Sequence, residues 1–129
     1  MKMRQHVEQL LAEIQAERPP DAGLNVRWID DPTPRQPHEP LPFEVVRDDD
    51  FEVVEVVLPV IRSPADYATC LHEIGHIRGR YQKAKYAELT RERWAWAWVR
   101  DHALNWTSDM EQEAKAFLQW YVERARSEK

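Results

Sequence analysis

The chain has 129 residues, 32% of them charged and 43% hydrophobic, and a formal net charge of −5 at pH 7. These values predict a single globular domain over residues 1–129, and the acidic balance argues against nucleic acid as the main partner, because phosphate binding favours a basic surface. No apolar stretch is long enough for a membrane span or a secretion signal, and the single cysteine fits a reducing compartment. The sequence therefore predicts a cytoplasmic protein without a membrane partner.

The first 60 residues predict one helix and three strands. Apolar residues recur at helical spacing over residues 2–17, and a pair of prolines follows. Residues 24–30 alternate between apolar and polar side chains, whereas residues 43–47 and 51–60 are rich in valine, and both patterns favour strands. The three aspartates at 48–50 are expected to form a hairpin turn. Five prolines within residues 31–42 exclude regular structure there, so we expect an extended loop.

The second half of the chain predicts three helices. Ser63, Pro64 and Asp66 are the residue types of a helix start, and Gly79 offers the stop. Two more helices are expected over residues 87–103 and from residue 107 or 108 to about residue 126. The first of these two contains three tryptophans and is expected to be largely buried. The predicted fold class is thus α+β: an N-terminal helix, a short three-stranded and mostly antiparallel sheet, and three further helices.

A metal-binding pattern, His72-Glu73-Ile74-Gly75-His76, lies inside the first of these three helices. Side chains at positions i and i+4 share one face of a helix, so His72 and His76 can present two imidazole nitrogens to one zinc ion. Glu73 lies roughly 100° around the helix, where it can act as general base on a water molecule that the zinc ion holds. This HExxH arrangement predicts Zn2+ as the cofactor and Glu73 as the catalytic residue. Cys70 projects away from this face and is interpreted as a packing residue.

A catalytic zinc ion usually takes a third protein ligand. Five residues beyond His76 are candidates: Glu88, Glu92, His102, Glu111 and Glu113. We favour Glu92, because 16 residues allow a turn and a returning helix, and because Ala95 one turn later and Gly75 opposite are small enough for two helices to approach closely. Glu111 is the alternative third ligand; it also fits a capping box that begins at Ser108, which offers it a purely structural role.

The segment from Leu71 to His76 resembles the gluzincin metallopeptidases. A predicted strand precedes it, and a predicted helix with a Glu-x-x-Ala pattern follows it. Within that group it is most similar to the small ImmA/IrrE-type proteins, and the likeness covers about residues 53–118. The resemblance implies a small zincin-like domain, a zinc site of two histidines and a later glutamate, and proteolysis of a regulatory protein. Tryptophans follow Glu92 where that family often has phenylalanine.

The expected function is therefore hydrolysis of a peptide bond in a protein or peptide substrate, with Glu73 as general base. Residues 55–59 are expected to bind that substrate as an added strand. Tyr81, Tyr86 and His102 are the candidates for stabilising the oxyanion. The alternative is a catalytically inactive zinc-binding interaction module, such as a phage-type inhibitor or a toxin/antitoxin partner. A structural domain without metal is the third possibility.

Overall fold

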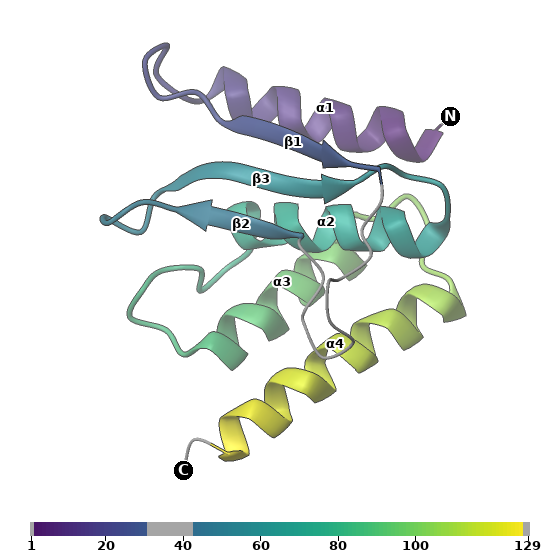
Figure 1. The fold of residues 1–129 in the computed structure, drawn as a ribbon. Coiled ribbons are helices and arrows are strands. Elements are labelled where there is room, and N and C mark those ends of the chain that lie inside the picture. Colours follow the sequence, from purple (N-terminus) through teal and green to yellow (C-terminus); the bar gives the residue numbers. More distant parts are fainter. Residues whose placement is uncertain (1, 31–42, 128–129) are drawn as a thin grey trace.

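The computed structural model describes residues 2–30 and 43–127, and the predicted loop at residues 31–42 lies outside them. The order of elements agrees with the predicted α+β class: an N-terminal helix, three strands and three further helices (Figure 1). Their bounds are α1 (Lys2–Ala16), β1 (Asn25–Ile29), β2 (Glu44–Arg47), β3 (Val53–Pro59), α2 (Pro64–Arg78), α3 (Glu88–His102) and α4 (Ser108–Ser127). None of the helices in these ranges has both the length and the apolar character that a bilayer span requires.

The three strands form a mixed sheet in the order β1-β3-β2. β1 pairs with β3 in parallel, with Asn25 opposite Glu55, and β2 pairs with β3 antiparallel, with Glu44 opposite Val57. β3 is therefore the central strand, and neighbours occupy both of its edges. The expectation that residues 55–59 bind substrate as an added strand is wrong for this reason, because a new strand needs a free edge.

The predicted hairpin turn joins β2 to β3, as expected from the three aspartates. The carboxylate of Asp48 accepts hydrogen bonds from the backbone N–H groups of Asp50 and Glu52, at 2.9 and 3.0 Å. The backbone of Asp48 also closes the turn, since its N–H donates to the carbonyl of Glu52 and its carbonyl accepts from Phe51. Phe51 adopts a left-handed backbone conformation with φ of 65°.

α2 is the helix around which the other elements pack: α1, α3, α4, β2 and β3 all contact it. It begins as predicted, because the Ser63 hydroxyl accepts from the Asp66 N–H at 3.1 Å, and it ends at Gly79. An unbroken run from Tyr67 to Gly75 is buried, so the helix is enclosed on all sides. Cys70 is fully buried and its thiol lies 3.5 Å from the carbonyl of Pro59, which confirms its packing role.

α3 and α4 lie beyond the β2 edge of the sheet, whereas α1 lies beside β1 (Figure 1). α3 is less buried than predicted: Trp96 is fully enclosed, but Trp94 remains 38% exposed. Two positions along a helix are about 200° apart, so these two rings face opposite sides. The predicted capping box at Ser108 is also wrong, because the hydroxyl of Thr107 caps α4 by accepting from the N–H of Met110.

Candidate metal centre

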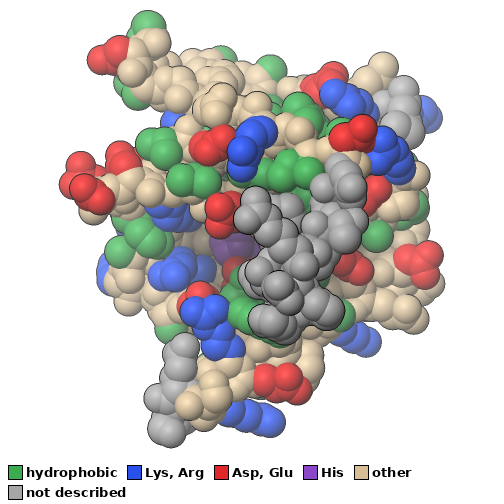
Figure 2. Space-filling model, in the orientation of Figure 1, with side chains coloured by type: hydrophobic (Ala, Val, Ile, Leu, Met, Phe, Trp, Pro, Cys, Tyr) green, Lys and Arg blue, Asp and Glu red, His purple; other side chains and the backbone are tan. Residues whose placement is uncertain are grey.

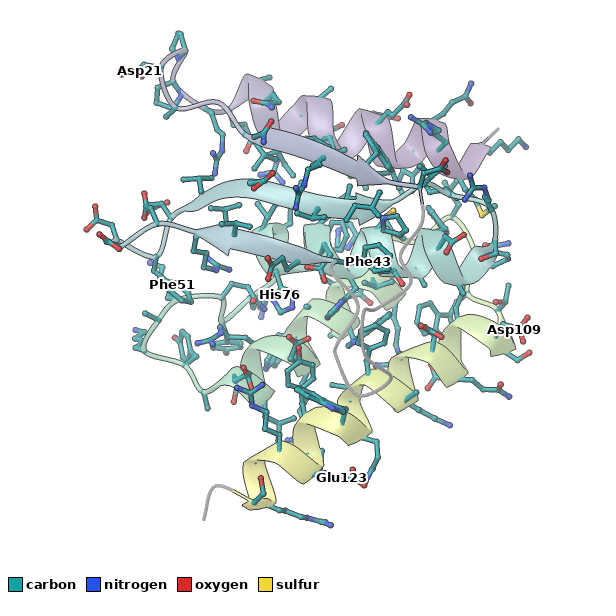
Figure 3. The ribbon with its side chains drawn as sticks, viewed as in Figure 1. Asp21, Phe43, Phe51, His76, Asp109 and Glu123 are labelled. Atoms are coloured by element: carbon teal, nitrogen blue, oxygen red, sulfur yellow. The ribbon has the colours of Figure 1, made fainter. Side chains whose placement is uncertain are left out.

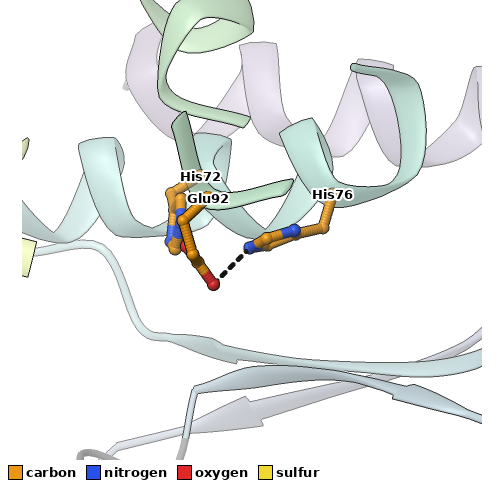
Figure 4. Close-up of side chains that lie close together, drawn as sticks. All are labelled: His72, His76 and Glu92. Atoms are coloured by element: carbon orange, nitrogen blue, oxygen red, sulfur yellow. Dashed lines mark hydrogen bonds and ion pairs between the residues drawn. The ribbon is translucent and has the colours of Figure 1, made fainter. Parts of the chain in front are cut away.

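Three donor groups from α2 and α3 meet between the helices and the sheet (Figure 4). Nε2 of His72 lies 2.6 Å from Oε2 of Glu92, and Nε2 of His76 lies 3.1 Å from Oε1 of the same carboxylate. His72 and Glu92 are buried, and His76 is partly exposed. The structure thus brings together the two histidines and the favoured third residue of the sequence prediction.

The close approach of α2 and α3 places Glu92 there. A Cβ atom added at Gly75 would lie 2.6 Å from the backbone carbonyl oxygen of Ala95, a distance that real Cβ atoms do not reach. The predicted small-residue contact between the two helices is therefore confirmed. Glu92 precedes Ala95 by one turn of α3, and His72 and His76 flank Gly75 on α2, so this contact sets the separation of the donors.

The donor set could hold a metal ion, and its spacing can be compared with that of a zinc site. Zinc binds imidazole nitrogen and carboxylate oxygen at about 2.0–2.1 Å, which in a tetrahedral arrangement separates the donors by roughly 3.3 Å. The contacts of Glu92 with His72 and His76, at 2.6 and 3.1 Å, are slightly shorter than that separation. Small side-chain movements would therefore admit the ion, and His72, His76 and Glu92 are the residues that would hold it.

A glutamine that the sequence analysis did not single out orients His76. Nδ1 of His76 lies 2.9 Å from Oε1 of Gln82, while the amide nitrogen of Gln82 donates to the carbonyls of Arg80 and Arg91 at 3.1 and 2.8 Å. Because the amide nitrogen is engaged elsewhere, the glutamine oxygen accepts from Nδ1–H, which leaves the lone pair on Nε2 for a metal. Gln82 is buried, so its orientation is fixed.

Two carboxylates surround the buried ring of His72. Oε1 of Glu73 lies 3.2 Å from Nδ1, although that nitrogen has no hydrogen-bond partner among the described residues. Burial lowers the pKa of His72, but the carboxylates of Glu73 and Glu92 outweigh it and raise that pKa to about 9. The ring of Trp96 stacks on His72 with centroids 4.5 Å apart. The centre therefore favours a positive charge between its carboxylates, which a proton or a metal ion can supply.

A cavity of about 290 Å³, here called the site cavity, opens beside these groups. Its walls include Glu73, His76, Glu92 and, from α4, Tyr121. Burial and the neighbouring carboxylates raise the pKa of Tyr121 above its usual value, so its hydroxyl keeps its proton and remains a donor. No helical spacing relative to the HExxH residues could have pointed to Tyr121, because α4 reaches the site only through tertiary packing.

Of the other predicted site residues, Glu88 lines the site cavity but pairs with Arg124 at 3.3 Å, and the rest lie outside the described walls of that cavity. Glu111 accepts from Arg100 at 3.3 Å and from Nε1 of Trp106 at 2.7 Å, so it does not face the histidines. His102 stacks on Trp98 and its Nδ1 donates to that residue's carbonyl, which keeps it out of the site cavity. Tyr81 and Tyr86 pack edge to face near the end of α2, and they border a neighbouring cavity described below.

Comparisons with models of protein families, with curated proteins and with solved structures found no match for this chain.

Proposed function

We propose that this protein is a zinc-dependent metallopeptidase that hydrolyses a peptide bond in a protein or peptide substrate. The observation that carries the proposal is the meeting of His72, His76 and Glu92 beside a cavity that Glu73 also lines. Two histidines, one carboxylate and a separate glutamate are the residue types of a metal-assisted hydrolase. The buried single cysteine, Cys70, suits the reducing cytoplasm in which we place the protein.

Each residue has a defined part in this proposal. Zinc, when bound, supplies a Lewis acid that polarises the scissile carbonyl and makes a nearby water molecule more acidic. Glu73 takes a proton from that water molecule as it attacks the carbonyl carbon, and then passes the proton to the nitrogen of the leaving amine. Tyr121 donates a hydrogen bond from its hydroxyl to the oxygen on which negative charge develops. Gln82 holds the ring of His76 in the orientation and tautomer that metal binding requires.

Metal analysis of the untagged protein tests the site. We expect about one zinc ion per chain in the wild-type protein, as in other sites with three protein ligands. Zinc should be lost from Glu92→Ala and kept by Glu111→Ala, which is the matched control because Glu111 contacts Arg100 and Trp106 instead. Retention of zinc by Glu92→Ala would remove the third ligand from the proposal.

Hydrolysis is tested with a degenerate library of decapeptides, whose products are sequenced by mass spectrometry. Glu73→Gln should keep zinc and lose hydrolysis, because the amide cannot accept the proton. Undiminished turnover by that variant would refute the general-base assignment. A zinc-loaded wild-type protein that cleaves nothing in the library would point to a binding module in place of an enzyme.

A further inference from the structure

A second and larger cavity lies beside the site cavity, and we call it the basic cavity. It measures about 760 Å³ and is lined by the β2–β3 turn, the end of α2 and the loop that leads to α3. Arg47, Phe51 and His76 border both cavities, so the two form a continuous depression that passes the candidate metal centre. Figure 3 shows Phe51 at the β2–β3 turn and His76 between that turn and the helices.

The basic cavity has a charge opposite to that of the whole chain. Its described lining contains two acids, Asp50 and Glu52, and five cations: Arg18, Arg47, Arg80, Lys83 and Lys85. The sum, five positive and two negative charges, is +3, whereas the chain carries −5. Figure 2 shows blue basic side chains gathered to the left of a purple histidine that lies in a hollow of this face.

These five cations lack an ion-pair partner among the described residues, although six other arginines form ion pairs there. Arg18 and Arg47 instead donate to backbone carbonyls, and Lys85 lies 5.1 Å from the ring of Tyr86. Their charge is therefore available to a bound anion.

Arg47 connects this charge to the candidate metal centre. Its guanidinium donates to the carbonyl of Phe51 and to the carbonyl of His76, each at 3.0 Å. It lies 4.2 Å from the ring of Phe51, and the guanidinium of Arg91 lies 5.2 Å from the same ring. The guanidinium groups of Arg47 and Arg91 thus lie against the same ring, where their like charges repel each other. An entering carboxylate would relieve that repulsion.

The backbone of the cavity wall is strained at two places. Phe51 and Tyr81 have positive φ angles of 65° and 60°, and they are the only residues other than glycine with positive φ among those the structure describes. Both side chains line the basic cavity. Such conformations cost free energy in residues with a bulky side chain, and they tend to occur where a binding surface needs a particular shape.

We propose that the basic cavity binds a carboxylate group of the peptide substrate, so that the enzyme selects acidic peptides. This inference rests on the proposed peptidase function, because it assigns a role to the surface next to the bond to be cleaved. The carboxylate comes either from an aspartate or glutamate side chain close to that bond or from the free C-terminus of the peptide. Arg47 and the exposed residues Arg80 and Lys83 are the groups that would recognise it.

The test uses the decapeptide library in two forms, one with free C-termini and one with amidated C-termini. In the zinc-loaded wild-type protein, we expect aspartate and glutamate to be enriched on one side of the cleaved bond. The double variant Arg80→Glu/Lys83→Glu should reduce that enrichment by roughly two- to five-fold, the size of one exposed ion pair. Lys2→Glu/Lys115→Glu is the control, because it makes the same change of charge at exposed residues of α1 and α4 outside both cavities.

The outcomes separate this inference from the proposed function. Cleavage without acidic preference, or a preference that survives in Arg80→Glu/Lys83→Glu, would overturn the inference and leave the peptidase intact. Cleavage confined to peptides with a free C-terminus would identify the terminal carboxylate as the recognised group. If nothing is cleaved, the proposed peptidase function is refuted, and calorimetric titration with an aspartate-rich decapeptide then tests whether the basic cavity binds carboxylates. Binding that the double variant loses would support carboxylate binding by the cavity, and the absence of binding to the wild-type protein would overturn it.

Discussion

Gly75 and Ala95 lie against each other so closely that a methyl group at Gly75 would be 2.6 Å from the carbonyl oxygen of Ala95. Gly75 lies between the two histidines on α2, and Ala95 lies one turn beyond Glu92 on α3. The contact therefore relates the packing of two helices directly to the distances among the three candidate ligands. A change of one methyl group at this point would therefore shift the helix packing and the three candidate ligands together.

Gly75→Ala should separate the two helices and weaken both properties. We expect a loss of about 1–3 kcal/mol in the free energy of unfolding, as for other overpacked cores. Zinc affinity should fall as well, because Glu92 moves away from His72 and His76. Chemical denaturation and chelator competition measure the two effects. Gly23→Ala is the matched control, since the added Cβ would meet only Oε1 of Gln15 at an ordinary 3.5 Å; equal effects at both glycines would contradict the prediction.

Gln82→Ala should weaken zinc binding while leaving the three ligands in place. Without the glutamine oxygen, the Nδ1–H of His76 loses its partner and the ring can rotate. Loss of such an orienting partner typically lowers metal affinity about 10- to 100-fold. Gln82→Glu keeps an acceptor for Nδ1 and should recover part of the affinity. Gln112→Ala, at an exposed position of α4, should have no effect in the same chelator titration.

Tyr121→Phe should reduce turnover without loss of zinc. Removing one donor to a developing oxyanion typically lowers kcat by about 10²- to 10³-fold. Tyr81→Phe and Tyr86→Phe serve as controls, because these two tyrosines border the basic cavity and are absent from the walls of the site cavity among the described residues. The comparison of kcat values among the three variants decides which tyrosine takes part. A larger effect at Tyr81 than at Tyr121 would contradict the assignment.

Stability should fall with decreasing pH through His6, which is not one of the three candidate ligands. Nδ1 of His6 forms a hydrogen bond of 2.6 Å with the hydroxyl of Tyr67, and the same hydroxyl accepts from the N–H of Leu104 at 3.0 Å. Burial lowers the pKa of His6. The charge of Glu13 raises this pKa by a smaller amount, and His102 lowers it slightly further.

Because the unfolded chain binds a proton to His6 more readily than the folded chain, folding is favoured at high pH. The contribution of His6 is fully present above the ordinary pKa of about 6.5 and is lost as the pH falls through the lower pKa of the folded state. Denaturant titrations between about pH 7.5 and 5 measure this slope. His6→Gln should flatten the profile, and an unchanged slope would show that another group is responsible.

The features that depend on local spacing were predictable from the sequence. His72 and His76 share one helical face, the start of α2 at Ser63 follows from capping chemistry, and the small residue after Glu92 indicated how the third donor could approach. These patterns need only a few consecutive residues. For that reason the pair of histidines, the helices and the three strands are placed correctly.

The features that depend on tertiary packing were not predictable in the same way. Gln82 lies in a loop whose path depends on α3, and Tyr121 is nearly 50 residues beyond Glu73. The sequence did contain one indication that β3 is an inner strand, namely the uninterrupted apolar run from Val56 to Leu58. Strands that are covered on both faces contain such runs, because the alternation of apolar and polar residues is then lost. Trp94 and Trp96 have the same residue type, and only the packing of α3 determines which of them is enclosed.

The candidate centre is local in the chain, since His72 and Glu92 are 20 residues apart and lie on consecutive helices. Closing so short a loop costs little chain entropy compared with contacts between distant segments. Exchange of an ion bound there should therefore require only that the α2–α3 hairpin opens, while the sheet and α1 stay folded. The rate at which a chelator removes zinc should accordingly follow this partial opening, as hydrogen exchange of the α3 amides reports it, and not the much slower global unfolding.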